Sequence, residues 1–156
     1  MVPDGPVDDI LAMLRERDRL VEGWVRALRR RRRALAERYV TFADTDDLVG
    51  VPESLADELR TLIEGLVSDL DAQVDDLEGD LETVRKLRVA LDGADGEARE
   101  ELVASAETVD AALTRKGDSI EDLLGTADRL VDRLDRIVET PPDPDSDPGD
   151  EPGEPR

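Results

Sequence analysis

The sequence predicts an all-α protein, arranged as an elongated helical hairpin or three-helix bundle with coiled-coil segments. Three observations predict this fold class. Charged residues make up 40% of the chain, only three residues are aromatic, and aliphatic residues recur at helical spacing in three long segments. Such a composition favours narrow seams between long helices over a thick globular core. We expect residues 1–140 to form a single helical domain.

The first predicted helix covers about residues 7–42, and Pro6 suits its first turn. Its apolar stripe consists of residues at helical spacing: Ile10, Leu14, Val21, Trp24, Leu28, Leu35, Tyr39 and Phe42. Arg17 lies near the middle of this stripe, so it needs an acidic partner or a route to solvent. Arg31 and Arg32 border the stripe, and we expect their aliphatic stems to lie over it.

The second predicted helix covers about residues 52–91 and ends at the two-glycine turn signal 92–96. Its seam is predicted to open with Leu55, Leu59, Leu62 and Leu66 and to close with Val74, Leu77, Leu81, Val84 and Leu91. Leu66, Leu70 and Val74 follow one another at steps of four, so the seam slips in phase there. The short breaks between these long helices favour antiparallel neighbours.

The third predicted helix, about residues 96–140, has the most regular pattern. Alternate steps of four and three residues from Leu102 meet apolar residues at every seam position except Lys116, as in a supercoiled helix. We predict an interaction seam formed by Leu102, Val109, Leu113, Ile120, Leu123, Leu130, Leu134 and Ile137. Lys116 either fixes the register or oligomeric state, or extends its ammonium to solvent past Gly117; we favour the solvent route.

Residues 141–156 form an acidic tail that holds six of the nine prolines and no large apolar residue, so we expect it to be disordered. The fragment 143–154 spaces its carboxylates in a way similar to a calcium-binding loop. Such a loop needs glycine at its sixth position, where Pro148 stands. We therefore predict no specific metal site and no cofactor.

Charge is divided unevenly along the chain. Residues 1–42 carry a net charge of +3 and residues 43–156 a net charge of −23, which gives −20 for the whole protein. Five arginines of the first helix fall on the face opposite its apolar stripe. We call this set the arginine ridge: Arg15, Arg19, Arg26, Arg30 and Arg33.

Three interpretations of the arginine ridge are open. The first is pairing with acidic helices of this chain or of a second copy, because arginine holds carboxylates bidentately. The second is a solvated face. The third is nucleic-acid binding, since arginine clusters along a helix are typical of phosphate recognition. We rank the third last, because aromatic stacking residues are nearly absent and salt weakens phosphate binding steeply.

No candidate catalytic constellation is present in the sequence. The chain has neither cysteine nor histidine, which removes thiol chemistry and the commonest general base near neutral pH. The carboxylates stand in solvated charge runs, whereas catalytic carboxylates need an apolar pocket to shift their pKa values. No phosphate-binding glycine motif occurs. We predict that the protein is not an enzyme.

The composition resembles that of haloarchaeal proteins, because Asp outnumbers Glu by 25 to 16 and lysine occurs only twice. A high-GC bacterial coiled-coil protein could have a similar composition. No signal peptide and no apolar run of about 18 residues is found, so we expect a cytoplasmic protein without membrane insertion. We predict a structural or adaptor protein that associates through its helices, as a homo-oligomer or with another helical protein. The alternative is a nucleic-acid-associated protein that uses the arginine ridge.

Overall fold

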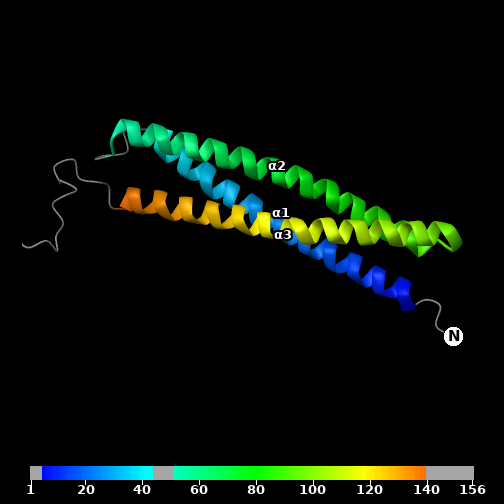
Figure 1. The fold of residues 1–156 in the computed structure, drawn as a ribbon. Helices are drawn as coiled ribbons and strands as arrows, with labels where there is room; N and C mark the ends of the chain where they lie inside the picture. Colours follow the sequence, from blue (N-terminus) through cyan, green and yellow to red (C-terminus); the bar gives the residue numbers. More distant parts are fainter. Residues whose placement is uncertain (1–4, 44–50, 140–156) are drawn as a thin grey trace, which may run out of the picture. The chain divides into compact units, whose positions relative to one another are not determined.

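A computed structural model describes residues 5–43 and 51–139, and these contain three α-helices and no strand (Figure 1). Helix α1 spans Gly5–Ala43, α2 spans Glu53–Asp92 and α3 spans Gly96–Glu139. The all-α prediction is confirmed, and the predicted helix bounds differ from the observed ones by at most two residues. The expected disordered tail, residues 141–156, lies outside the described residues, as does its fragment that is similar to a calcium loop.

The helix ends follow local sequence signals. Pro52 precedes α2, and the amide of Ala56 donates to its carbonyl oxygen at 3.0 Å, which closes the first turn. The turn between α2 and α3 is closed by the amide of Ala94, which donates to the carbonyl oxygen of Leu91 at 3.3 Å. Gly96 then has a φ of +59°, a left-handed conformation that glycine adopts without a steric penalty.

The described residues form two compact units, and each unit contains a part of all three helices. The first unit comprises the described residues of Met1–Arg30 and Leu70–Leu124. The second unit comprises those of Arg31–Asp69 and Gly125–Arg156. Each helix therefore contributes one stretch of its length to each core.

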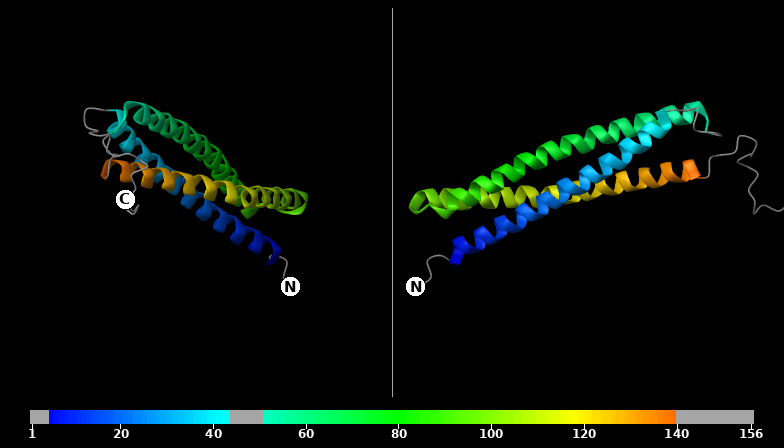
Figure 2. Two further views of the ribbon diagram at one scale, coloured as in Figure 1. Left: turned by 60° about the vertical axis from the view of Figure 1, so that its left-hand side comes forward. Right: turned by 180° about the vertical axis from the view of Figure 1, so that it is seen from behind.

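In the first unit, α2 and α3 leave their connecting turn side by side, and the amino-terminal turns of α1 diverge from them (Figures 1 and 2). Contacts between Asp18 and Arg85 and between Arg29 and Glu78 show that α1 and α2 run antiparallel. Trp24 marks the contact of α1 with α3. A methyl group built on Gly117 would lie 3.7 Å from Cζ2 of Trp24, so the indole lies close over α3.

The core of the first unit is built from aliphatic residues at alternating helical steps. The buried residues are Leu14, Val21, Val25 and Leu28 of α1, Leu70, Val74, Leu77, Val84, Leu87 and Leu91 of α2, and Ala106, Leu113 and Ile120 of α3. Along α2, Leu66, Leu70 and Val74 are all buried although they follow one another at steps of four. The predicted phase slip is therefore present in the helix.

The core of the second unit corrects one sequence prediction. Its buried apolar residues are Leu35 and Phe42 of α1, Ala56, Leu59, Ile63 and Leu66 of α2, and Ala127 and Leu134 of α3. Leu62, predicted to lie in the seam, is 43% exposed, whereas Ile63 is 1% exposed. Both residues satisfy a step of three or four from Leu59, so the spacing alone did not decide between them.

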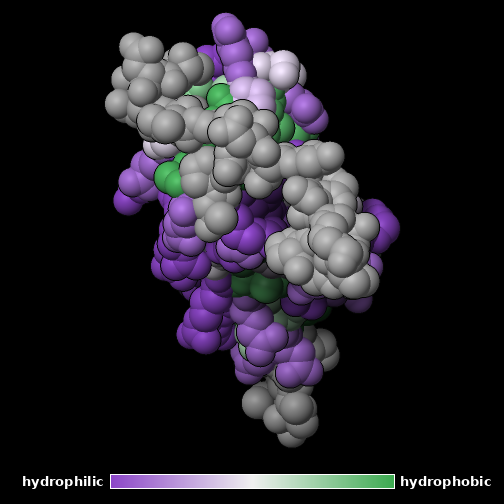
Figure 3. Space-filling view, turned by 90° about the vertical axis from the view of Figure 1, so that its left-hand side faces the viewer, coloured by the Kyte–Doolittle hydropathy of each residue, from purple (hydrophilic) through white to green (hydrophobic). Residues whose placement is uncertain are grey.

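Hydrophilic side chains dominate the molecular surface. In the face drawn in Figure 3, purple hydrophilic residues surround small, separate green patches of hydrophobic residues. Four large apolar side chains of the described residues are nevertheless exposed: Val40, Leu62, Val89 and Val138. Isolated apolar residues on a surface are normal, so only their neighbours decide whether any of them marks a contact surface.

Candidate functional site

The predicted interaction seam of α3 consists of two rows that differ in burial. Its buried members, Leu113, Ile120 and Leu134, belong to a row with a seven-residue repeat that also contains Ala106 and Ala127. Its other members are half-buried: Leu102, Val109, Leu123, Leu130 and Ile137. One row therefore serves the cores of the units, and the other leaves apolar area accessible along the helix.

Ion pairs join the helices of the first unit. Arg17 of α1 has the acidic partner that its position in the apolar stripe required, because its Nε donates to Oδ1 of Asp110 of α3 at 2.5 Å. Arg29 of α1 donates to Glu78 of α2 at 2.6 Å. The Arg17–Asp110 pair joins α1 to α3 and is part-buried, whereas the Arg29–Glu78 pair joins α1 to α2 and is exposed, so water screens the second pair more strongly.

The second unit repeats the same kind of contact twice. Arg31 donates to both carboxylate oxygens of Asp128, at 3.0 and 3.1 Å, and Arg38 does the same to Asp135. The arginines are seven residues apart and so are the aspartates, so α1 and α3 run parallel here. Hydrogen bonding to Asp135 also raises the pKa of Arg38. Bidentate arginine–carboxylate pairs are thus the recurrent contact between α1 and α3 in this unit.

Asp18 is the most unusual residue of the first unit, because it is a carboxylate that is only 6% exposed. Arg85 of α2 donates to both of its oxygens, at 2.9 and 3.3 Å, and Arg88 donates to Oδ2 at 3.2 Å. The hydrogen bonds from Arg85 lower the pKa of Asp18, although burial acts in the opposite sense, and the positive charge of Arg88 lowers it further. The carboxylate is therefore charged in the folded protein near neutral pH.

The position of Asp18 in the sequence indicated that it could be buried, although its charge suggests an exposed residue. Asp18 lies four residues after Leu14 and three before Val21, so it occupies a seam position of α1. A charged residue at such a position usually indicates a specific partner. What the sequence does not show is that Arg85 and Arg88 of another helix approach it.

Lys116 occupies the corresponding polar position of the α3 seam, and neither interpretation made from the sequence describes it fully. Its side chain is 28% exposed, and its ammonium contacts Asp76 at 2.7 Å and Asp80 at 2.5 Å on α2. Burial lowers the pKa of Lys116, but the two carboxylates outweigh it and raise the pKa overall. Lys116 thus joins α3 to α2 instead of extending alone into solvent.

The arginine ridge behaves differently from these paired residues. All five of its members are exposed, and none of them makes an ion pair or a hydrogen bond with another described residue. Four of them belong to the first unit, and Arg33 belongs to the second. The described helices of the chain therefore do not supply carboxylates for the ridge.

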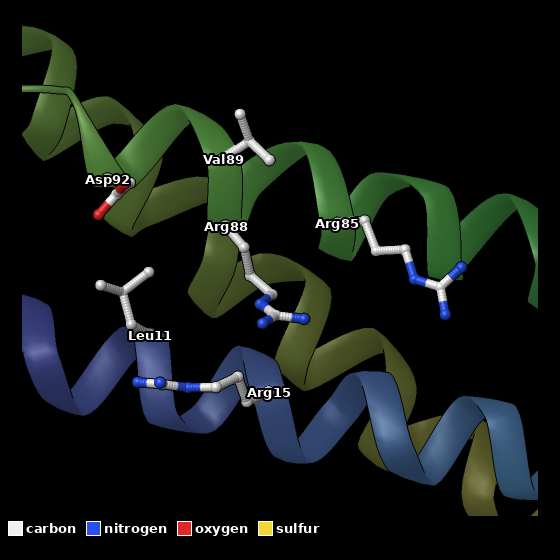
Figure 4. Close-up of a pocket in the computed structure, with 6 residues that line it drawn as sticks. All are labelled: Leu11, Arg15, Arg85, Arg88, Val89 and Asp92. Atoms are coloured by element: carbon white, nitrogen blue, oxygen red, sulfur yellow. The ribbon is translucent and has the colours of Figure 1, made fainter.

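A groove of about 480 Å³ lies between α1 and α2 in the first unit (Figure 4). It is lined by Leu11 and Arg15 of α1 and by Arg85, Arg88, Val89 and Asp92 of α2. Figure 4 shows Arg88 pointing from α2 towards α1, whereas the guanidinium of Arg15 lies below Leu11. Asp18 already binds Arg85 and Arg88, so Arg15 is the cation of this lining that has no partner among the described residues.

A groove of about 330 Å³ in the second unit has an apolar lining. Ala36 and Val40 of α1 and Ile63 and Val67 of α2 line it, together with Arg32, Tyr39 and Glu64. The hydroxyl of Tyr39 donates to Oε2 of Glu64 at 2.7 Å, which joins α1 and α2 beside the apolar residues. Val40 is 68% exposed, so the groove presents aliphatic area to solvent.

Residues 5–43 and 51–139 hold neither a metal-binding cluster nor a membrane-spanning helix. No group of three or more acidic side chains is placed to hold a metal ion there. None of the three helices combines the length and apolar character needed to cross a membrane. Comparisons with protein-family models, with curated proteins and with solved structures find no match to the chain.

Proposed function

We propose that the protein is a non-catalytic structural or adaptor protein of the cytoplasm that acts through helix–helix association. The observation that carries this proposal is the apolar groove between α1 and α2 of the second unit, with Val40 exposed in it. Helices bind such grooves by laying an apolar face into them. The half-buried row of α3 provides an apolar face of this kind, so a second copy of the chain is the occupant to which we commit.

The acidic composition supports a halophilic setting for this association. At about 1 M salt the screening length is only about 3 Å, so repulsion between two chains of net charge −20 is suppressed beyond direct contact. Apolar contacts are strengthened by many salts rather than weakened. We therefore expect self-association to increase with salt concentration, in contrast to phosphate binding.

Replacement of Val40 by aspartate tests the proposal. A carboxylate placed in the apolar groove must be desolvated when a partner helix binds, which costs more than the about 1–3 kcal/mol of an uncharged polar group. We expect the dissociation constant of the self-associated protein to rise by at least about tenfold. Sedimentation velocity over a series of protein and salt concentrations measures this change, and far-UV circular dichroism checks that the helices are retained.

Val89→Asp is the matched control. Val89 is also an exposed valine, 77% exposed, but it belongs to α2 of the first unit, does not line the apolar groove and is not part of α3. Its substitution should leave association unchanged. A wild-type protein that stays monomeric over the whole series, or equal effects of the two substitutions, contradicts the proposal.

Nucleic-acid binding is the second candidate function, and the observation that favours it is the exposed arginine ridge, which has no partner among the described residues. The net charge of −20 opposes it, because the whole chain is repelled by a polyanion. The chain also has only three aromatic residues with which to stack on bases.

A further inference from the structure

The arginine ridge differs from the cations that form ion pairs with a neighbouring helix. In the first unit, five such cations bind carboxylates of another helix: Arg17, Arg29, Arg85, Arg88 and Lys116. The four ridge arginines of the same unit, Arg15, Arg19, Arg26 and Arg30, have no such partner among the described residues. Among the described residues, ion pairs thus join the helices of this unit, and the ridge arginines take no part in them.

A complementary set of carboxylates lies on α3 of the same unit. We call it the acidic line: Glu107, Asp118 and Asp122, which are all exposed. With Ala111, these residues follow one another at steps of four, seven and four, which are the steps between the four ridge arginines. Glu107 directly follows the buried Ala106, as Arg15 directly follows the buried Leu14, so both sets occupy outward positions of their helices.

We infer that a second copy of the chain covers the arginine ridge of the first unit, with the acidic line of its α3 against the ridge of α1. This inference rests on the proposed self-association and names the surface that orients it. The order of steps, four, seven and four, is unchanged when one helix is reversed. Glu107 and Asp118 therefore lie opposite arginines whether the two helices run parallel or antiparallel. A two-fold axis repeats the contact, because each copy carries both the ridge and the line.

The charge distribution favours a second copy over nucleic acid as the occupant. A contact between the arginine ridge of one copy and the acidic line of the other, which we call a ridge–line contact, pairs positive with negative charge. The two-fold axis repeats this pairing, so both charged sets of both copies are covered. A polyanion would neutralise the ridge but would leave the acidic line exposed to solvent, and the polyanion would repel it. Contact pairs also persist at high salt better than long-range attraction, since the partners lie within the screening length of about 3 Å.

A charge-swap experiment tests the inference with three double variants. The line variant is Glu107→Arg with Asp118→Arg. The first ridge variant is Arg15→Glu with Arg26→Glu, which faces the line variant in a parallel pairing. The second ridge variant is Arg19→Glu with Arg30→Glu, which faces it in an antiparallel pairing. Sedimentation velocity is measured for each variant alone, and for the line variant mixed in equal amounts with each ridge variant.

We expect each variant alone to dissociate at least about tenfold more readily than the wild type. One of the two mixtures should recover an affinity close to that of the wild type, because both contacts of the heterodimer again join opposite charges. The mixture that recovers identifies the direction of the helices. Failure of both mixtures to recover overturns the inference.

Two controls separate a ridge–line contact from a general effect of net charge and from association through the apolar groove alone. Arg115→Glu with Arg133→Glu makes the same change in net charge at exposed arginines of α3 and should leave association unchanged. If Val40→Asp dissociates the protein while the ridge variants stay associated, the inference fails and the proposed function stands.

Fluorescence anisotropy with labelled single-stranded and duplex DNA completes the test. We expect no binding by the wild-type protein at its working salt concentration, because the ridge is covered by the second copy. Binding that is lost in the ridge variants, together with failed recovery in both mixtures, assigns the ridge to nucleic acid instead.

Discussion

Replacing Leu113 by alanine is expected to lower the free energy of unfolding by about 2–5 kcal/mol. Leu113 is 1% exposed and belongs to the buried row of α3, so its removal leaves a cavity that the surrounding helices fill only in part. Leu113→Met changes the shape but not the apolar character of the side chain and should cost less than about 1.5 kcal/mol. Urea unfolding followed by the fluorescence of Trp24, the only tryptophan, reports on the first unit directly.

Leu123→Ala is the matched comparison for Leu113→Ala. Leu123 lies in the same helix and the same unit, but it belongs to the half-buried row. We expect its replacement to cost about half as much or less, because less apolar area returns to water and no closed cavity forms. Equal losses of unfolding free energy for the two variants would show that the two rows contribute equally to the core. The half-buried row would then have no accessible apolar area for self-association.

The difference between these rows shows how far periodicity predicts this fold. The 3–4 spacing predicted the three helices and included the buried row of α3. It did not separate Leu113 from Leu123, because both satisfy the same repeat. Burial within a repeat depends on which neighbouring helix approaches which side, and that is a property of the packed structure. In α2, the spacing likewise placed Leu62 in the seam where Ile63 is the buried residue, because it does not show which side the neighbouring helix approaches.

Charge patterning had a similar limit. The sequence identified Arg17 as a residue that needed a partner, and it placed the ridge arginines on the outer face of α1. It did not show that Asp110 would be the partner of Arg17, because registers between helices depend on all their contacts together. The abundance of aspartate also concealed Asp18, since one buried carboxylate cannot be distinguished by residue type from many exposed ones.

Replacing Asp18 by asparagine is expected to lower the free energy of unfolding by about 1–3 kcal/mol near neutral pH. Asparagine keeps the shape of the side chain but loses the charge that Arg85 and Arg88 bind. Its amide group also places a donor where the carboxylate had only acceptors. Asp75→Asn, at an exposed residue of α2 in the same unit, is the control and should cost close to nothing.

The pH dependence of this loss separates the effect of the lost charge from that of the added amide donor. Because the pKa of Asp18 is lowered from 3.8, its charge stabilises the folded protein fully above that value, and the contribution is lost as the pH falls through the lowered pKa. The cost of Asp18→Asn should therefore be constant near neutral pH and shrink in acid below pH 3.8, where the wild-type carboxyl also becomes neutral. Urea unfolding of both proteins by Trp24 fluorescence at successive acidic pH values measures this difference. A cost that persists unchanged in acid would show that the loss comes from the amide donor of asparagine and not from the missing charge.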